Sequence, residues 1–181
     1  GSSDERFGPL LQRFGDKGSV RVKGYGGFDA FATNYRMSEP QAAVAAAQLT
    51  RLDQIVSQRN RLGDLLTENI AELPGIIPHE VHPEDRAVYW FYMFRLIPSA
   101  FRINRSSFVK ALRAEGASVR GGYIGKPLYG EQVFQNHAFF AGRWPVQEMG
   151  LTDMDFTTHK CPNAESLLTD GIRVPIYEYM T

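Results

Sequence analysis

The residues best suited to chemistry form a short polar run directly before a predicted helix that begins at Ser38. Asn34, Tyr35 and Arg36 supply an amide, a phenol and a guanidinium at three successive positions. Because a helix N-terminus presents free N–H groups and a partial positive charge, such a run could bind a phosphate or a carboxylate. Polar residues near a helix cap more commonly bond to the local backbone, and that alternative stays open.

Four other groups of residues resemble chemical sites, and for each of them a structural explanation is favoured. His79 and His82 lie among acidic residues in a proline-marked loop, where no regular element would hold metal ligands, so we expect them to be solvated. The glycine-rich stretch 23–27 lacks the spacing of a phosphate-binding loop. We expect Cys161 to pack as a small hydrophobe, and the aromatic run 89–94 to form core rather than a base-stacking surface.

The charge balance and the cysteine count exclude several classes of partner. The 181 residues hold 20 Lys and Arg against 20 Asp and Glu, so the formal net charge is zero, whereas proteins that grip nucleic acid or anionic lipid carry clustered positive charge. A single cysteine excludes an internal disulfide and a thiolate metal cluster, and it favours a reducing compartment. The best apolar run, 88–97, is interrupted by Arg95 and is too short to span a membrane. We therefore expect a cytoplasmic protein with no metal, nucleic-acid or membrane partner.

A long helix is expected directly after the polar run, over residues 38–73. Ser38 and Gln41 fit a capping box, and Pro40 is tolerated in the first turn. Apolar residues then recur at helical spacing, with an interruption at Arg59. A helix of this length, about 54 Å, is typical of a spine shared between domains or subunits.

Smaller elements are expected on either side of this helix. Apolar spacing predicts a first helix over 3–18, followed by a glycine-rich aromatic loop. Farther along, we expect Asn104 to cap a helix and Gly116 to end it. The predicted order after the long helix is strand, helix, strand, loop, helix, strand, at 86–97, 105–115, 117–124, 126–158, 162–168 and 171–177. This order predicts an α/β fold in which helices pack on a small sheet.

The polar run and the helix after it resemble a known family. Asn34-Tyr35-Arg36-Met37-Ser38-Glu39, followed by Gln41-Ala42-Ala43 and Gln48-Leu49, is similar to the motif of the pyridoxal-phosphate-dependent nucleotide-sugar aminotransferases of the DegT/DnrJ/StrS family. The likeness extends over most of the chain, at Gly116, Tyr123, Pro127-Leu128-Tyr129, Cys161-Pro162, Ala164-Glu165 and Val174-Pro175.

The resemblance implies a particular place in a larger fold. The chain would be the C-terminal portion of a fold-type I aminotransferase, with the tail end of the large cofactor domain and an active-site loop at 1–37. A long connecting helix at 38–73 would lead into a small C-terminal α/β domain at 74–181.

The same resemblance implies a shared site in a homodimer. Asn34 would contact the phosphate of pyridoxal 5'-phosphate in the neighbouring subunit, and Tyr35 and Arg36 would line that site. Tyr123 and Tyr129 are candidate substrate-binding residues. Tyr129 stands where the family commonly has a histidine near the bound sugar, so the acceptor stays open between a nucleotide sugar, a cyclitol and another ketone. Glutamate or glutamine would donate the amino group.

No residue of this chain is expected to be catalytic. In the family, the lysine that binds the cofactor lies well upstream of the motif, and Lys23 precedes Asn34 by only 11 residues. We therefore expect a portion of an enzyme that has no transaminase activity alone. The alternatives are a non-catalytic dimerisation or binding module and a regulatory homologue that has lost catalysis.

Overall fold

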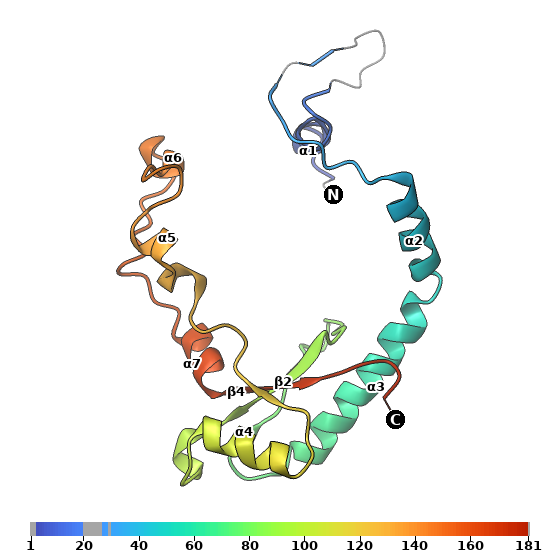
Figure 1. Ribbon diagram of the computed structural model, residues 1–181, viewed down its shortest axis with the longest axis vertical. Helices are drawn as coiled ribbons and strands as arrows, with labels where there is room; N and C mark the ends of the chain where they lie inside the picture. Colours follow the sequence, from blue (N-terminus) through green and yellow to red (C-terminus); the bar gives the residue numbers. More distant parts are fainter. Residues whose placement is uncertain (1–2, 20–26, 29, 181) are drawn as a thin grey trace. The chain divides into compact units, whose positions relative to one another are not determined.

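The computed structural model describes residues 3–19, 27–28 and 30–180, and the chain divides into two units (Figure 1). Unit 1 is Gly1–Leu52 and unit 2 is Asp53–Thr181. Residues 23–26, most of the stretch expected to be a structural loop, lie outside the described residues.

Unit 1 contains two helices. α1 spans Phe7–Gly15, and α2 spans Glu39–Leu49. The predicted capping box is confirmed, since the Ser38 N–H donates to Gln41 Oε1 at 3.0 Å. α1 is shorter than the helix predicted over 3–18.

The single helix expected over 38–73 is two helices in the structure. α2 ends at Leu49, and α3 spans Leu52–Ile70. Between them, Thr50 Oγ1 donates to the Ala47 carbonyl at 2.8 Å, and the Arg51 N–H donates to the Gln48 carbonyl at 3.1 Å. These bonds reach back three residues rather than four, which tightens the last turn of α2 and interrupts the regular ladder.

The sheet of unit 2 has four antiparallel strands in the order β1-β2-β4-β3. They are β1 (Ile76–Ile77), β2 (Phe91–Leu96), β3 (Arg120–Gly121) and β4 (Gly171–Pro175). β2, β3 and β4 lie within the three predicted strands and confirm them. β1 was not predicted, because its two residues follow a helix end and precede a proline.

One face of this sheet forms the core. Along β2, Tyr92, Phe94 and Leu96 are buried and the residues between them are half-buried, which is the alternation of a strand with one covered face. Leu62 of α3 and Val109 of α4 (Arg105–Ala114) pack in the same cluster.

Helices and short turns complete unit 2. α4 spans Arg105–Ala114, and its predicted cap is confirmed because Asn104 Oδ1 accepts from the Ser107 N–H at 2.9 Å. Gly116 has φ +92°, as expected of the residue that ends this helix. The remaining elements are η1 (Pro98–Ala100), η2 (Leu128–Gly130), α5 (Gln132–Gln135), α6 (Pro145–Glu148) and α7 (Pro162–Asp170).

Arg59, which interrupts the apolar stripe of the predicted long helix, has a clear structural use. Its Nη1 donates to the Tyr89 carbonyl at 3.2 Å, and its Nη2 lies 3.0 Å from a carboxylate oxygen of Glu178. The guanidinium thus joins α3 to the start of β2 and to the end of the chain.

Among the described residues, no helix combines the length and the apolar character needed to cross a membrane.

Candidate functional site

The polar run of unit 1 is fixed by backbone bonds to the end of α1. The Tyr35 N–H donates to the Gly15 carbonyl at 2.8 Å, and the Lys17 N–H donates to the Thr33 carbonyl at 2.8 Å. Asp16 and Asn34 form an isolated antiparallel bridge between the two segments. The run therefore has a defined backbone path before the chain enters α2.

The side chains of the run are exposed, and part of their bonding is local. Asn34 Oδ1 accepts from the Arg36 N–H at 3.3 Å, and Arg36 Nη1 lies 3.7 Å from Asp16 Oδ1. The ring of Tyr35 lies 6.3 Å from that of Phe14 and is 71% exposed. Within the described residues the Asn34 side-chain amide donates no hydrogen bond, so its two N–H donors are available to a ligand.

Tyr123 lies in unit 2, in an aromatic group around a cation. Its ring centroid is 5.4 Å from that of Phe91 and 6.0 Å from that of Trp90. The guanidinium carbon of Arg173 lies 5.1 Å from the centre of the Tyr123 ring and 5.3 Å from the centre of the Phe91 ring. These are cation–π distances, so Tyr123 helps to hold Arg173 in place.

The hydroxyl of Tyr129 is already bonded within unit 2. It donates to the Glu165 carboxylate of α7 and accepts from the Cys161 N–H at 3.2 Å. The hydrogen bond to Glu165, and after it partial burial, raises the pKa of Tyr129 above its ordinary value. Tyr129 therefore connects η2 to the start of α7, and it does not lie in the group that contains Tyr123.

Cys161 has a polar neighbour that the packing interpretation did not include. Its Sγ lies 3.2 Å from His159 Nε2, and both residues are half-buried. His159 also meets the ring of Tyr129 edge-on, with the ring centres 5.4 Å apart. Cys161 is thus partly buried as a packed residue would be, but within a polar group.

Of the two loop histidines that were expected to be solvated, only one is exposed to solvent. His79 is packed rather than solvated, because its ring centre lies 5.5 Å from that of Tyr89 and 5.8 Å from that of Tyr92. The backbone N–H of His79 donates to the Tyr92 hydroxyl at 3.1 Å. His82 is exposed. Over the described part of the chain, no three side chains of the metal-ligating types come together.

The aromatic run 89–94 is core only in part. Tyr89, Tyr92 and Phe94 are buried, as predicted, but Trp90 is 71% exposed. Tyr89 has φ +36°, so the backbone turns just before β2, and the side chains do not alternate simply at this point.

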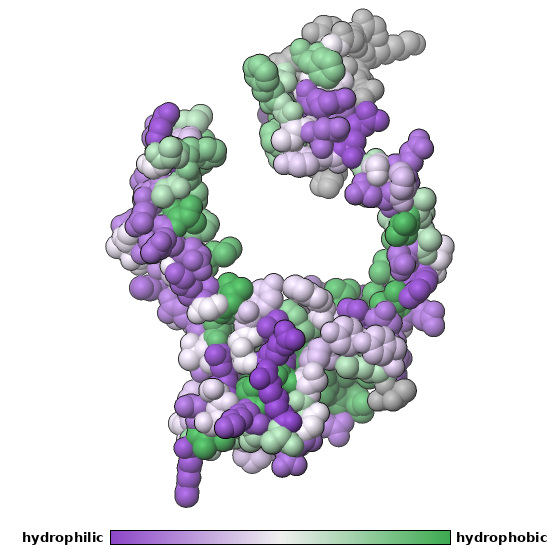
Figure 2. All heavy atoms as spheres, viewed as in Figure 1, coloured by the Kyte–Doolittle hydropathy of each residue, from purple (hydrophilic) through white to green (hydrophobic). Residues whose placement is uncertain are grey.

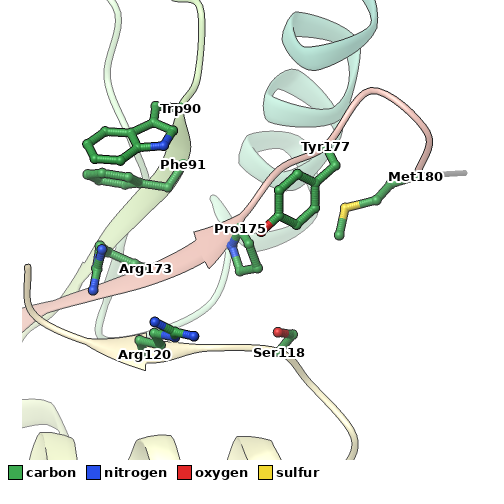
Figure 3. A pocket seen from close by; sticks show the side chains of 8 residues that line it. All are labelled: Trp90, Phe91, Ser118, Arg120, Arg173, Pro175, Tyr177 and Met180. Atoms are coloured by element: carbon green, nitrogen blue, oxygen red, sulfur yellow. The ribbon is translucent and has the colours of Figure 1, made fainter.

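The structure adds a pocket that the sequence reasoning missed (Figure 3). It has a volume of about 290 Å³ on the sheet of unit 2 and contains two arginines, Arg120 and Arg173. A possible signal was the position of each arginine within a predicted strand, but their pairing depends on a register that the sequence does not reveal. The full lining is Trp90, Phe91, Ser118, Arg120, Arg173, Pro175, Tyr177 and Met180.

Comparison with known proteins gives a consistent picture. The model of the DegT/DnrJ/EryC1/StrS aminotransferase family matches residues 3–181. A putative L-glutamine:3-amino-2,3-dideoxy-scyllo-inosose aminotransferase of Micromonospora echinospora is 30% identical over 118 residues, which are 64% of this chain and 28% of that protein. The 3-amino-5-hydroxybenzoate synthase of Amycolatopsis mediterranei is 27% identical over 144 residues, 77% of this chain and 33% of the relative.

Solved structures have the same fold. The Helicobacter pylori aminotransferase PseC covers 99% of this chain with a TM-score of 0.70 at 18% identity, and DesV of S. venezuelae covers 99% with a TM-score of 0.71 at 22% identity. The chain spans 43% and 41% of these two structures, and about a third of the length of the curated relatives it matches.

Proposed function

Because the chain belongs to the DegT/DnrJ/EryC1/StrS aminotransferase family, we propose that it is the C-terminal part of an enzyme that transfers an amino group to a cyclic ketone. The observation that carries this proposal is the family match over residues 3–181. Glutamate or glutamine is the proposed donor. The product would be an amino sugar or a related amino-carbocycle for antibiotic or polysaccharide biosynthesis.

The proposed cofactor is pyridoxal 5'-phosphate, which supplies an electron sink for the transfer when it is bound. The residues of unit 1 fit its phosphate, since the Asn34 amide has free donors and Arg36 adds a positive charge. The bond from the Arg36 N–H engages only Oδ1 of Asn34, so it leaves the N–H₂ group at the other end of the amide free. Asp16 lies near Arg36 and reduces the local positive charge, so we assign the specific phosphate contact to Asn34.

The main candidate acceptor is a keto-sugar, free or linked to a nucleotide. The alternative acceptor is a carbocyclic ketone, and two observations support this alternative. The names of two relatives refer to a scyllo-inosose derivative and to an aminobenzoate, which are both carbocycles. In addition, the Tyr129 hydroxyl is bonded to Glu165 and to the Cys161 N–H, so it is poorly placed to replace the histidine that the family commonly has near the sugar.

We propose that the complete protein is a cytoplasmic homodimer in which unit 1 of one subunit contributes Asn34 to the site of the other. The lysine that would bind the cofactor and move protons is expected outside this chain. The chain alone would then bind substrate or partner surfaces without catalysing amino transfer.

The test is an amino-transfer assay on the intact protein. With pyridoxal phosphate and glutamine or glutamate, we expect amination of a keto-sugar or a keto-cyclitol, measured as the keto acid formed from the donor. The 181-residue chain alone should be inactive. An intact protein that is inactive with every donor and acceptor pair would overturn the proposal and favour the binding module.

The role of Asn34 can be separated from its local bond. Asn34→Ala removes the proposed donor, and Asn34→Asp keeps the oxygen that accepts from the Arg36 N–H but replaces the donor with a negative charge. We expect both variants to bind cofactor at least about tenfold more weakly, since a hydrogen bond to a charged group contributes roughly 1.5–3 kcal/mol. Cofactor retention after dialysis of the intact protein measures this. Normal retention by Asn34→Asp would mean that Asn34 only shapes the loop.

A further inference from the structure

We propose that the pocket on the sheet of unit 2 binds a small molecule in which a carboxylate or a phosphate is attached to a flat ring. The oxyanion would lie between Arg120 and Arg173, and the ring would lie against the aromatic side chains around them. Figure 3 shows Trp90 and Phe91 along one border of this pocket, Ser118 and Arg120 along the opposite border, and Arg173 and Pro175 between them.

Strand register brings the two arginines together. Arg120 of β3 is the direct cross-strand partner of Arg173 of β4, and Arg173 is the partner of Met93 of β2. Residues paired in this way project from the same face of a sheet. Tyr92 and Phe94 occupy the buried core face, so both arginines belong to the other face.

A like-charge pair at directly opposed strand positions is destabilising. The pocket lining contains no aspartate or glutamate that could offset it. Across the described residues, neither arginine forms an ion pair with a carboxylate. A bound anion would offset the repulsion between the two arginines, so an anion site would explain why two positive charges are paired here.

Arg173 is held in advance in a conformation that suits a ligand. Its Nε donates to the Gly122 carbonyl at 2.6 Å, and its guanidinium packs on the rings of Phe91 and Tyr123. Within the described residues, the two terminal nitrogens of Arg173 donate to no protein acceptor. Guanidinium groups with free terminal donors match the two oxygens of a carboxylate or phosphate.

The rest of the lining indicates that the ligand has a ring and is small. Trp90, one of the two tryptophans of the chain, is 71% exposed, although its side chain is large and aromatic. Trp90 and Tyr177 offer flat apolar faces beside the Phe91 ring, on which Arg173 packs, and Ser118 adds a hydroxyl. A volume of about 290 Å³ is close to the lower limit of roughly 300 Å³ for small-molecule pockets. A single ring with one anionic group suits these features.

The test is direct binding to the full chain, without any measurement of amino transfer, so its outcome is independent of the proposed function. Benzoate and phenyl phosphate are the two anionic probes, benzamide is the neutral probe and inorganic phosphate lacks the ring. Calorimetry gives the affinity, and quenching of tryptophan fluorescence reports a ring close to Trp90. We expect benzoate to bind at least about tenfold more tightly than benzamide. We also expect phenyl phosphate to bind at least about tenfold more tightly than inorganic phosphate.

Variants locate the site. Arg120→Met should weaken binding of the anionic probe at least about tenfold, because a charge-assisted hydrogen bond is lost. The matched control is Arg102→Met, which removes an exposed arginine outside the pocket and should leave affinity unchanged. Trp90→Phe should abolish the quenching, although Trp144 remains. Equal affinity for benzamide and benzoate, equal affinity for phosphate with and without the ring, or equal behaviour of the two arginine variants would overturn the proposal.

Discussion

At the residue scale, the hydroxyl of Tyr129 links two segments of unit 2. It connects η2 to α7 by donating to Glu165 and accepting from the Cys161 N–H. A phenol that donates to a carboxylate holds its proton more strongly, which raises the pKa of Tyr129. The same bond fixes the loop that Pro127 begins.

The first prediction concerns this proton. Glu165→Gln removes the negative charge that the Tyr129 hydroxyl faces, so the pKa of Tyr129 should fall toward its ordinary value of about 10. A ¹³C NMR titration of the tyrosine ring carbons measures it, with Glu131→Gln as the control. Since the folded-state pKa is raised, the bond stabilises the fold fully below about pH 10 and is lost as the pH rises through the raised value. An unchanged Tyr129 titration in Glu165→Gln would contradict this assignment.

The Asn34 run shows how far single residues could be predicted from the sequence. An amide and a guanidinium before a helix cap indicated an anion site, and the structure places Asn34, Tyr35 and Arg36 together at the end of α1. The local bond from the Arg36 N–H was the stated alternative, and it is present as well. The oxygen of the Asn34 amide makes the local bond and its N–H₂ group is free for an anion, so the local-bond and anion-site interpretations are compatible.

At the element scale, local patterns were predictable and long-range ones were not. The caps at Ser38 and Asn104 depend on residues within three positions, and both are confirmed. The break at Thr50 depends on whether neighbouring structure supports the ladder, and α2 buries none of its residues. The pairing of Arg120 with Arg173 requires strand register, which composition and periodicity do not provide.

Helix α3 provides a prediction about close packing. A Cβ built on Gly63 would lie 2.6 Å from Cζ of Tyr89, so the glycine lets that ring rest against the helix. Gly63→Ala should therefore lower the free energy of unfolding by about 1–3 kcal/mol, although alanine favours a helix by roughly 1 kcal/mol. Chemical denaturation measures the change.

Gly15→Ala is the matched control for Gly63→Ala, because a Cβ at Gly15 at the end of α1 would meet no atom within 4 Å. This control should be neutral or slightly stabilising. Equal effects of the two substitutions would show that Tyr89 does not contact α3 closely.

Helix α4 provides a prediction about capping. Asn104→Ala leaves the Ser107 N–H without its side-chain acceptor, so the free energy of unfolding should fall by about 1 kcal/mol. Asn104→Asp keeps an acceptor at the cap and should retain most of the stability. Thermal unfolding of the two variants makes the comparison, and a loss of equal size in both would argue against the cap.

At the scale of the whole molecule, the two units differ in how they are stabilised. All buried hydrophobic residues that the structure describes lie between Val56 and Ile176, in unit 2. In unit 1, the apolar side of α1 is about half exposed, and Figure 2 shows apolar side chains at the surface around this helix. The apolar side of α1 consists of Phe7, Leu10, Leu11 and Phe14. Unit 1 therefore has little core of its own, which agrees with the proposal that it belongs to a larger domain and a dimer.

The last prediction tests that proposal on the intact protein. If the apolar side of α1 is covered where subunits or domains meet, replacing Leu10 and Phe14 together with lysine would place two charges in an apolar contact. We expect the dimer to dissociate at least about tenfold more readily, because each buried apolar side chain contributes roughly 1.5–3 kcal/mol. Sedimentation velocity over a concentration series measures the dissociation. Gln12→Lys adds a charge to the same helix away from the apolar side, so this control should remain dimeric. A double variant that stays dimeric would show that the apolar side of α1 is not part of the dimer contact. An unmodified protein that is monomeric throughout the series would contradict the shared site, because Asn34 would then have no neighbouring subunit to reach.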